Sequence, residues 1–182
     1  MRAFVCRTSL IIAAALATGC SSTAAKPDAT APATQADQPT ATAPCLMQAG
    51  GVTVLRLTAP PDVRCAATDG ELRFVAKQYE VEFWLVPGAQ TVDEATGRVP
   101  QQIASEFKDF KPDQTTDLTV AGSPAKRLVG TGHEADDGDD GGADVIVFKV
   151  GDHVFVACNH DEKLTPAGQN GMLALVQTAQ AP

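Results

Sequence analysis

Aromatic residues are scarce in this sequence of 182 residues, which contains one Trp and one Tyr. We therefore expect Trp84 and Tyr79 to lie in the core or at the edge of a sheet, since isolated aromatic residues do not form a platform for ligand stacking. Long apolar runs are scarce too. The run from Leu10 to Ala17 falls short of the roughly 20 residues that a transmembrane helix needs, and no later stretch approaches that length, so we expect no transmembrane helix.

Three kinds of catalytic or cofactor motif are also missing. The sequence has no Gly-x-Ser-x-Gly elbow for a nucleophilic serine, no glycine-rich loop of the Walker or dinucleotide type, and no Cys-x-x-Cys. Ser105 and Ser123 lack neighbouring residues that would present them to a histidine. We therefore predict that the protein is not an enzyme and that it holds no cofactor.

Basic residues are outnumbered by acidic ones, 14 against 22, which gives the full chain a formal net charge of −8. A surface with this balance repels the phosphates of nucleic acids and the headgroups of anionic lipids. We therefore expect no nucleic acid among the partners of this protein.

The N-terminus has a basic segment, an apolar run and then Leu16-Ala17-Thr18-Gly19-Cys20, which is the layout of a secretory signal peptide. These last residues resemble the lipobox of bacterial lipoproteins, whose cysteine is diacylated and becomes the first mature residue. The resemblance implies cleavage after residue 19 and a membrane anchor on Cys20. Because Ser21 and not Asp follows, it also implies the outer membrane, facing the periplasm. An ordinary signal peptide cut nearby would instead leave a soluble protein.

We divide the chain into three parts. Residues 1–19 form the signal peptide. Residues 20–44 carry the lipidated cysteine and an Ala/Thr/Pro-rich stretch without large apolar side chains, which cannot offset its ordering entropy and is expected to be a disordered tether. Residues 45–182 are long enough to bury a core and are expected to form one domain.

Three cysteines remain for this domain once Cys6 is cleaved off and Cys20 is lipidated: Cys45, Cys65 and Cys158. In an oxidising compartment they allow one structural disulfide and one free thiol. Pairing Cys45 with Cys65 closes the shortest loop, whereas either could pair with Cys158 instead. The sequence leaves these pairings open.

Alternating apolar residues and turn signals predict strands over residues 52–58, 63–68, 72–76, 79–86, 118–120, 125–131, 145–150 and 154–158. The two-residue turn at Gly151-Asp152 pairs Phe148 with Phe155 and Val147 with Val156. Both faces of this hairpin are apolar, so we expect it to lie in the middle of a sheet with material on both sides.

Helical signals occur in two regions. After a capping box at Thr91, the spacing of Ile103, Phe107 and Phe110 predicts a helix over about 99–110 with these three side chains on one face. Thr165-Pro166 provides an N-cap and a first-turn proline for a last helix. Because that helix contains two glycines, it must depend on packing for its stability.

The order of strands, helix, strands and helix predicts an α+β domain with helices packed on an antiparallel sheet. This order, and the run Leu118-Thr119-Val120-Ala121-Gly122-Ser123-Pro124-Ala125-Lys126-Arg127-Leu128, resembles the PsbP-like/DcrB-like α/β/α sandwich, in which such a strand turn follows the first long helix. The resemblance implies a fold, and a binding or assembly role without shared catalytic residues.

Several aspartates of residues 136–144 could provide the oxygen ligands that Ca²⁺ prefers. They are Asp136, Asp137, Asp139, Asp140 and Asp144. Their spacing does not match an EF-hand in any register. Glycine and aspartate are also typical of an exposed strand connection, so the alternative is a solvated hairpin tip.

A second group of candidate ligands lies near the end of the last predicted strand. Cys158 and His160 would share a strand face, and Asp161 is adjacent. A metal site needs three or four ligands and no third ligand is specified, so we interpret these residues as structural.

We therefore expect a lipid-anchored envelope protein on the periplasmic face of the outer membrane, whose domain binds or assembles with another envelope protein. The membrane, reached through the lipid on Cys20, and an envelope protein of unknown identity are the expected partners. The alternative is a carrier of a small ligand or of Ca²⁺ that uses the sandwich cleft or the 136–144 loop.

Overall fold

A computed structural model describes residues 44–182. The predicted signal peptide, Cys20 and the tether up to residue 43 lie outside the described residues. The strands are β1 (Pro44–Ala49), β2 (Val52–Thr58), β3 (Arg64–Thr68), β4 (Glu71–Val75), β5 (Glu80–Leu85), β6 (Phe107–Val120), β7 (Ser123–Glu134), β8 (Asp140–Val150) and β9 (His153–Asp161). The helices are α1 (Val92–Thr96), α2 (Val99–Gln102) and α3 (Pro166–Gln177).

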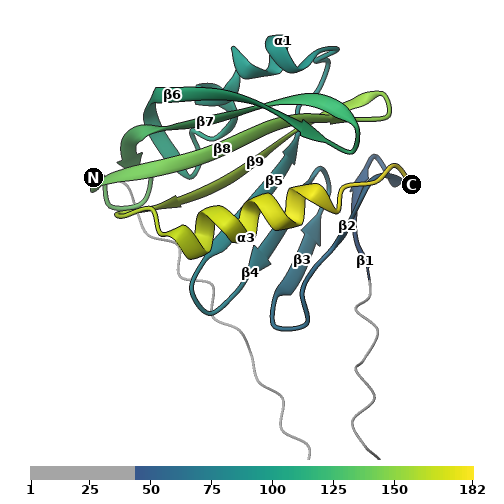
Figure 1. The fold of residues 1–182 in the computed structure, drawn as a ribbon, viewed down its shortest axis with the longest axis horizontal. Helices are drawn as coiled ribbons and strands as arrows, with labels where there is room; N and C mark the ends of the chain where they lie inside the picture. The colour runs from purple at the N-terminus through teal and green to yellow at the C-terminus, as the bar shows by residue number, and fades with distance from the viewer. Residues whose placement is uncertain (1–43) are drawn as a thin grey trace, which may run out of the picture. The chain divides into compact units, whose positions relative to one another are not determined.

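Seven of the strands form one antiparallel sheet in the order β3-β4-β5-β9-β8-β7-β6 (Figure 1). The strands β1 and β2 form a separate hairpin. A disulfide between Cys45 of β1 and Cys65 of β3 joins this hairpin to the edge of the large sheet, with the two Cα atoms 6.4 Å apart. Of the three cysteine pairings that the sequence left open, the structure thus contains the one that closes the shortest loop.

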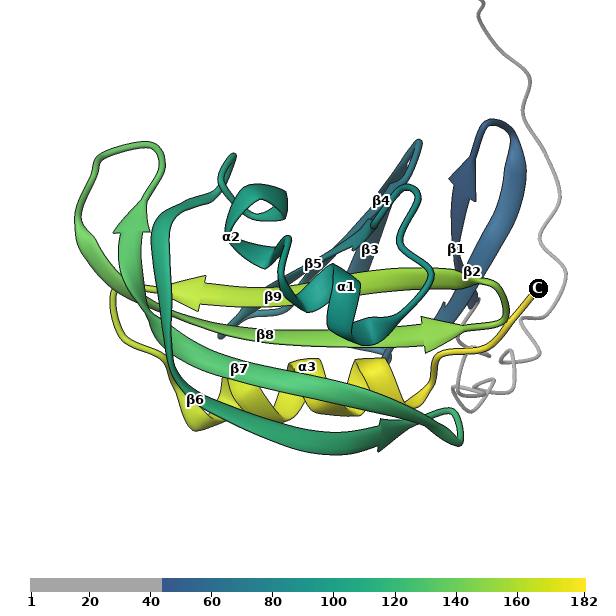
Figure 2. The same ribbon diagram turned by 90° about the horizontal axis from the view of Figure 1, so that it is seen from above.

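The two faces of the large sheet are covered by different elements (Figure 2). On one, which we call the α3 face, Phe74, Phe83 and Phe148 pack with residues of α3 and of the β1–β2 hairpin. On the other, the α1 face, Val145, Val156 and other apolar residues pack with α1, with α2 and with the segment that follows α2. The β8–β9 hairpin therefore lies in the middle with material on both sides, as the sequence predicted.

The predicted register of the β8–β9 hairpin is confirmed, because Phe148 pairs with Phe155 and Val147 with Val156. The predicted helix caps are confirmed too. Thr91 accepts a hydrogen bond from the backbone N–H of Glu94 at the start of α1, and Thr165 caps α3. These features depend on neighbours in the sequence, so local patterns were sufficient to identify them.

The expected α+β fold, with an α/β/α sandwich-like arrangement, is wrong. Strands make up 55% of the structure and helices 15%, and the three helices found among residues 44–182 are short. In particular, no long helix precedes the turn at Ala121-Gly122 in the described chain, because the helix expected over 99–110 is limited to the four residues of α2. The domain is predominantly β.

A bulge explains why the helical spacing of Phe107 and Phe110 was misleading. Both residues belong to β6, where residues three apart would ordinarily point to opposite faces. The pairing register shifts between Lys108 and Lys111, and Asp109 adopts a positive φ of 53°. The irregularity lets Phe107 and Phe110 both face the core, which imitates one side of a helix.

Pro112 lies inside β6. A proline is tolerated there because β6 is an edge strand, and one side of an edge strand has no partner that needs the missing N–H group.

The helix α3 approaches the sheet closely because its glycines leave room. A Cβ atom at Gly168 would lie 2.5 Å from the side chain of Asn159, and one at Gly171 would lie 2.4 Å from the ring of Tyr79. The two glycines weaken the isolated helix but allow this contact.

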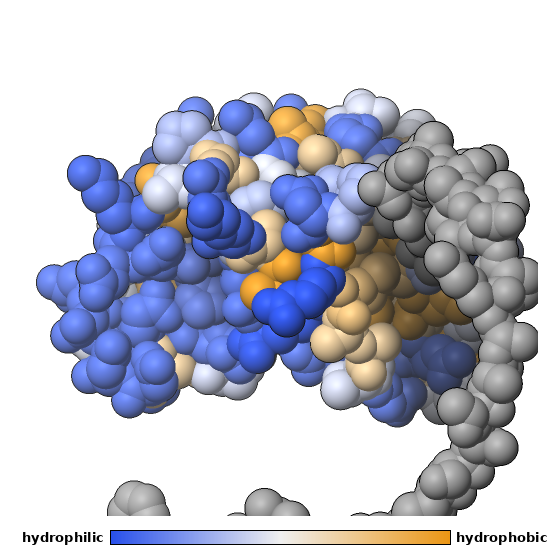
Figure 3. Space-filling view, turned by 90° about the horizontal axis from the view of Figure 1, so that it is seen from below, coloured by the Kyte–Doolittle hydropathy of each residue, from blue (hydrophilic) through white to orange (hydrophobic). Residues whose placement is uncertain are grey.

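Seen from below, the surface is largely hydrophilic, with apolar residues gathered in the middle of the view (Figure 3). None of the described helices has the length and apolar character needed to cross a membrane.

Candidate metal site

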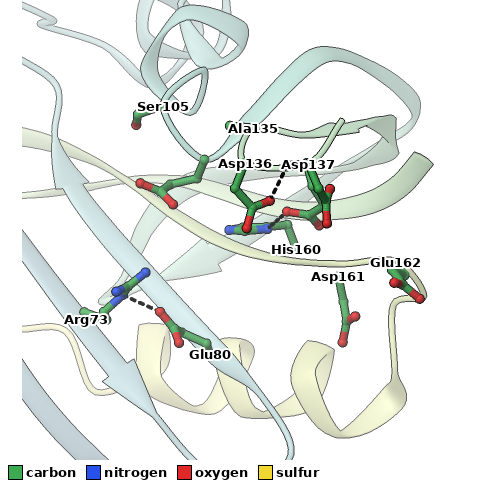
Figure 4. Close-up of a pocket in the computed structure, with 11 residues that line it drawn as sticks. Arg73, Glu80, Ser105, Ala135, Asp136, Asp137, His160, Asp161 and Glu162 are labelled. Carbon is green, nitrogen blue, oxygen red and sulfur yellow. Dashed lines mark hydrogen bonds and ion pairs between the residues drawn. The ribbon is translucent and has the colours of Figure 1, made fainter. Parts of the chain in front are cut away.

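Acidic residues gather around a cavity of about 470 Å³ at the end of β9. Figure 4 shows Arg73 of β4 and Glu80 of β5 on one side of this cavity. Asp136 and Asp137, from the turn between β7 and β8, lie close to His160 of β9. The cavity is therefore formed by strand ends and turns that are far apart in the sequence.

The buried carboxylate of Glu82 lies beside this cavity. Strand alternation places Val81 and Phe83 on the α3 face and Glu82 on the α1 face. The chain that includes α1 and α2 covers this face, and Glu82 is only 2% exposed.

One oxygen of Glu82 is held in place and the other is not. Arg73, the cross-strand neighbour of Glu82, donates a hydrogen bond of 2.7 Å from Nε to Glu82 Oε1 and also forms an ion pair with Glu80. Glu82 Oε2 is buried and has no hydrogen-bond partner. An unpartnered buried carboxylate oxygen costs free energy, so it marks a position where a cationic ligand would be favourable.

His160 is held on two sides. Its Nδ1 lies 2.8 Å from Oε2 of Glu134, and its ring centroid lies 5.9 Å from that of Phe107. Phe107 reaches this position because Gly132 and Gly141 lack side chains, since a Cβ atom on either would lie within about 3 Å of the Phe107 ring. The imidazole therefore has a defined orientation.

Glu82, Glu106 and His160 form a carboxylate–histidine cluster. Each offers one ligand atom, and the three atoms lie within 4.8 Å of one another. This is the only group of three or more such residues found among residues 44–182 that could hold a metal ion. Carboxylate oxygens and imidazole nitrogen are ligands for Zn²⁺ and similar divalent ions.

The charges around the cluster favour a dication. When ionised, Glu80, Glu82, Glu106 and Glu134 carry four negative charges, which face one positive charge on Arg73. A divalent ion bound at the cluster would reduce this excess of negative charge. Burial and the nearby carboxylate of Glu106 raise the pKa of Glu82 to about 7 in the metal-free protein, while Arg73 and His160 act in the opposite direction.

The aspartates predicted as Ca²⁺ ligands do not form such a cluster. Asp136, Asp137, Asp139 and Asp140 are exposed at or beside the tip of the β7–β8 hairpin. Asp136 Oδ1 accepts a hydrogen bond from the backbone of Asp137, and Asp137 Oδ1 accepts one from Asp139. Asp140 pairs with His133.

Asp144, by contrast, is fully buried on β8 and binds Arg127, so it does not belong to the turn.

Cys158 lies next to the cluster but outside it. It is buried, is not in a disulfide and is the cross-strand neighbour of Glu82. Burial raises the pKa of the Cys158 thiol well above its usual range, which favours the uncharged form and disfavours a role as thiolate ligand. The sequence did associate Cys158 with His160 on one strand face, yet the other members of the cluster are Glu82 and Glu106.

Sequence reasoning missed Glu82 and Glu106 because they lie 24 positions apart, Glu82 on β5 and Glu106 in the turn before β6. One available signal was the acidic residue Glu82 within the apolar stretch Val81-Glu82-Phe83-Trp84. A charged residue in an otherwise apolar strand indicates a buried functional group only if another segment packs over that face of the sheet. The sequence does not show that the segment containing α1 and α2 does so.

The sequence matches no protein-family model, and no curated protein matches it either. A solved structure from Bacteroides thetaiotaomicron is similar with a TM-score of 0.47 and 10% identity, over 70% of this chain and 45% of that one. LpqN, involved in cell envelope biogenesis of Mycobacterium tuberculosis, has a TM-score of 0.42 and 14% identity, over 70% of this chain and 83% of that one.

A protein of unknown function from Pseudomonas aeruginosa has a TM-score of 0.37 and 14% identity, over 68% of this chain and 84% of that one. These scores are too low to establish a shared fold, and no function follows from them.

Proposed function

We propose that this protein is a non-enzymatic binding module of the bacterial cell envelope that binds a divalent transition-metal ion at Glu82, Glu106 and His160. The observation that carries this proposal is that Glu82, whose Oε2 is buried and unpartnered, clusters with a second carboxylate and an imidazole. A bound ion would provide the missing partner for this oxygen.

The ligand set favours a transition metal over Ca²⁺. Calcium takes 6–8 oxygen ligands, whereas this cluster offers two carboxylates and a nitrogen. Zn²⁺ accepts His and Glu ligands in sites of four ligands, three of which the protein can supply. We therefore take Zn²⁺ as the first ion to test and Mn²⁺ as the second. The 136–144 loop as a Ca²⁺ site is the weaker candidate, because Asp136 and Asp137 each bind a backbone N–H group through one oxygen and Asp140 pairs with His133.

The experiment is a Zn²⁺ titration of the untagged full-length protein by calorimetry, with Glu82→Gln and His160→Gln as test variants. We expect one ion per wild-type chain and an affinity at least about 100-fold lower in each variant, since loss of an outer partner alone costs 10–100-fold. His153→Gln is the matched control, because His153 is exposed at the β8–β9 turn. Equal affinities of the wild type and His160→Gln would refute the site.

The envelope location is supported by the lipobox-like segment that ends at Cys20. In cells that express the full chain, Cys20→Ser should accumulate as an unacylated precursor, and acylation of this variant would show that the anchor is assigned wrongly. Fractionation of the wild type would then distinguish the outer membrane from the inner one.

We also propose that the anchored domain meets another envelope protein. Crosslinking in living cells, from the acylated protein with a C-terminal tag, should capture one abundant envelope protein that is lost when residues 45–182 are deleted. Capture of nothing above background would count against this partner and leave the metal-binding role to stand on its own test.

A further inference from the structure

Glu134 contacts His160, one of the three residues of the candidate metal site, directly. It is the last residue of β7, and its side chain is 15% exposed. Its Oε2 faces Nδ1 of His160 at 2.8 Å. An ionised carboxylate can only accept a hydrogen bond, so with Glu134 ionised this contact requires the proton to be on Nδ1.

We infer that Glu134 is a positioning residue, which holds His160 in the Nδ1–H tautomer so that Nε2 carries the lone pair available to an ion. This inference rests on the proposed metal site. Imidazole ligands of metals generally donate their other N–H group to a carboxylate or carbonyl, which fixes the tautomer and the ring plane. Glu134 supplies that acceptor here.

The rest of the surroundings agree with this role. Phe107 lies against the His160 ring, and the Phe107 ring can take this position because residues 132 and 141 are glycines. Glu134 Oε1 is itself buried without a hydrogen-bond partner. Glu134 therefore contacts His160 through one oxygen, at Nδ1, and its other oxygen has no partner. Its charge makes the electrostatic potential at the imidazole more negative and leaves Nε2 free to bind an ion.

The contact between Glu134 and His160 also affects which ion the site prefers. A fixed neutral imidazole provides a nitrogen donor, which favours Zn²⁺ over the oxygen-preferring Ca²⁺. Without Glu134 the ring could adopt the Nε2–H tautomer, which would leave two carboxylates as the remaining ligands. Loss of Glu134 should therefore lower the affinity for Zn²⁺ more than the affinity for Ca²⁺.

The decisive measurement is the tautomer of His160 in the metal-free full-length protein, read from ¹⁵N-histidine NMR at pH 8 with a chelator present. We expect the Nδ1–H form in the wild type and in Asp139→Ala, an exposed residue of the same hairpin. We expect a shift toward the Nε2–H form in Glu134→Ala, and a smaller shift in Glu134→Gln, which keeps an acceptor oxygen.

Metal titrations of the same variants complete the test. Glu134→Ala should bind Zn²⁺ about 10–100-fold more weakly than the wild type, and Glu134→Gln should lose less. An Nε2–H tautomer in the wild type, or an unchanged tautomer in Glu134→Ala, would overturn the positioning role whatever the metal does. If the tautomer follows Glu134 while the wild type binds no Zn²⁺, the positioning role stands, and the metal site and its selectivity are overturned.

Discussion

Replacement of Glu82 by glutamine should make the metal-free protein more stable at alkaline pH. Glutamine has nearly the shape of glutamate and keeps an oxygen that can accept the hydrogen bond from Arg73. It carries no charge, however, so it avoids the cost of an ionised group in a buried place. The variant therefore separates the structural role of the side chain from its charge.

The magnitude follows from the pKa of Glu82, which rises from 4.5 to about 7 on folding. Between these two values the folded state binds more protons than the unfolded state, so the free energy of unfolding falls as pH rises through this window. Each pH unit contributes about 1.4 kcal/mol. The wild type thus loses about 3 kcal/mol from this group by pH 8, and Glu82→Gln loses none of it.

Urea unfolding at pH 5, 6, 7 and 8 with a chelator present measures this effect. The difference in unfolding free energy, variant minus wild type, should grow by about 2 to 3 kcal/mol from pH 5 to pH 8. Asp152→Asn removes an exposed carboxylate and serves as the matched control. A difference for Glu82→Gln that stays constant over this range would refute the claim that Glu82 is buried without adequate partners.

Three further predictions concern stability, each measured by urea unfolding. Cys65→Ser should lower the free energy of unfolding by about 2 to 4 kcal/mol, and a reductant should lower that of the wild type equally. Gly168→Ala should be destabilising by about 1 to 3 kcal/mol, because its new methyl group meets buried Asn159; a gain in stability would contradict this contact. Arg127→Ala should cost about 3 to 5 kcal/mol by leaving buried Asp144 unpaired, and a second change, Asp144→Ala, should restore part of the loss.

Predictions from the sequence succeeded where the determining interactions are local. The β8–β9 register depends on a two-residue turn and on the alternation beside it, both of which can be read from neighbouring residues. The caps at Thr91 and Thr165 likewise bind N–H groups three residues away.

The fold class was predicted wrongly because it depends on pairing between distant segments. Residues 107–120 form the edge strand β6 through their pairing with β7, including a bulge that the sequence does not announce. The apolar spacing alone fits a helix equally well. Short apolar patterns of this kind cannot be assigned to helix or strand without the partner strand.

The candidate site depends on the same long-range pairing of distant segments. The free energy that the buried, ionised Glu82 costs the folded protein favours a functional role for this residue. By the reasoning above, charged Glu82 removes about 3 kcal/mol from a domain whose whole stability is expected to be about 5–15 kcal/mol. Glutamine would keep the contact with Arg73 without this cost, so the structural contact alone does not require a glutamate. A dication that binds the folded state alone would reverse the sign, because its binding free energy adds to the stability. The buried charge is thus unfavourable in the metal-free protein and would become favourable if a dication bound, which is the behaviour expected of a binding site.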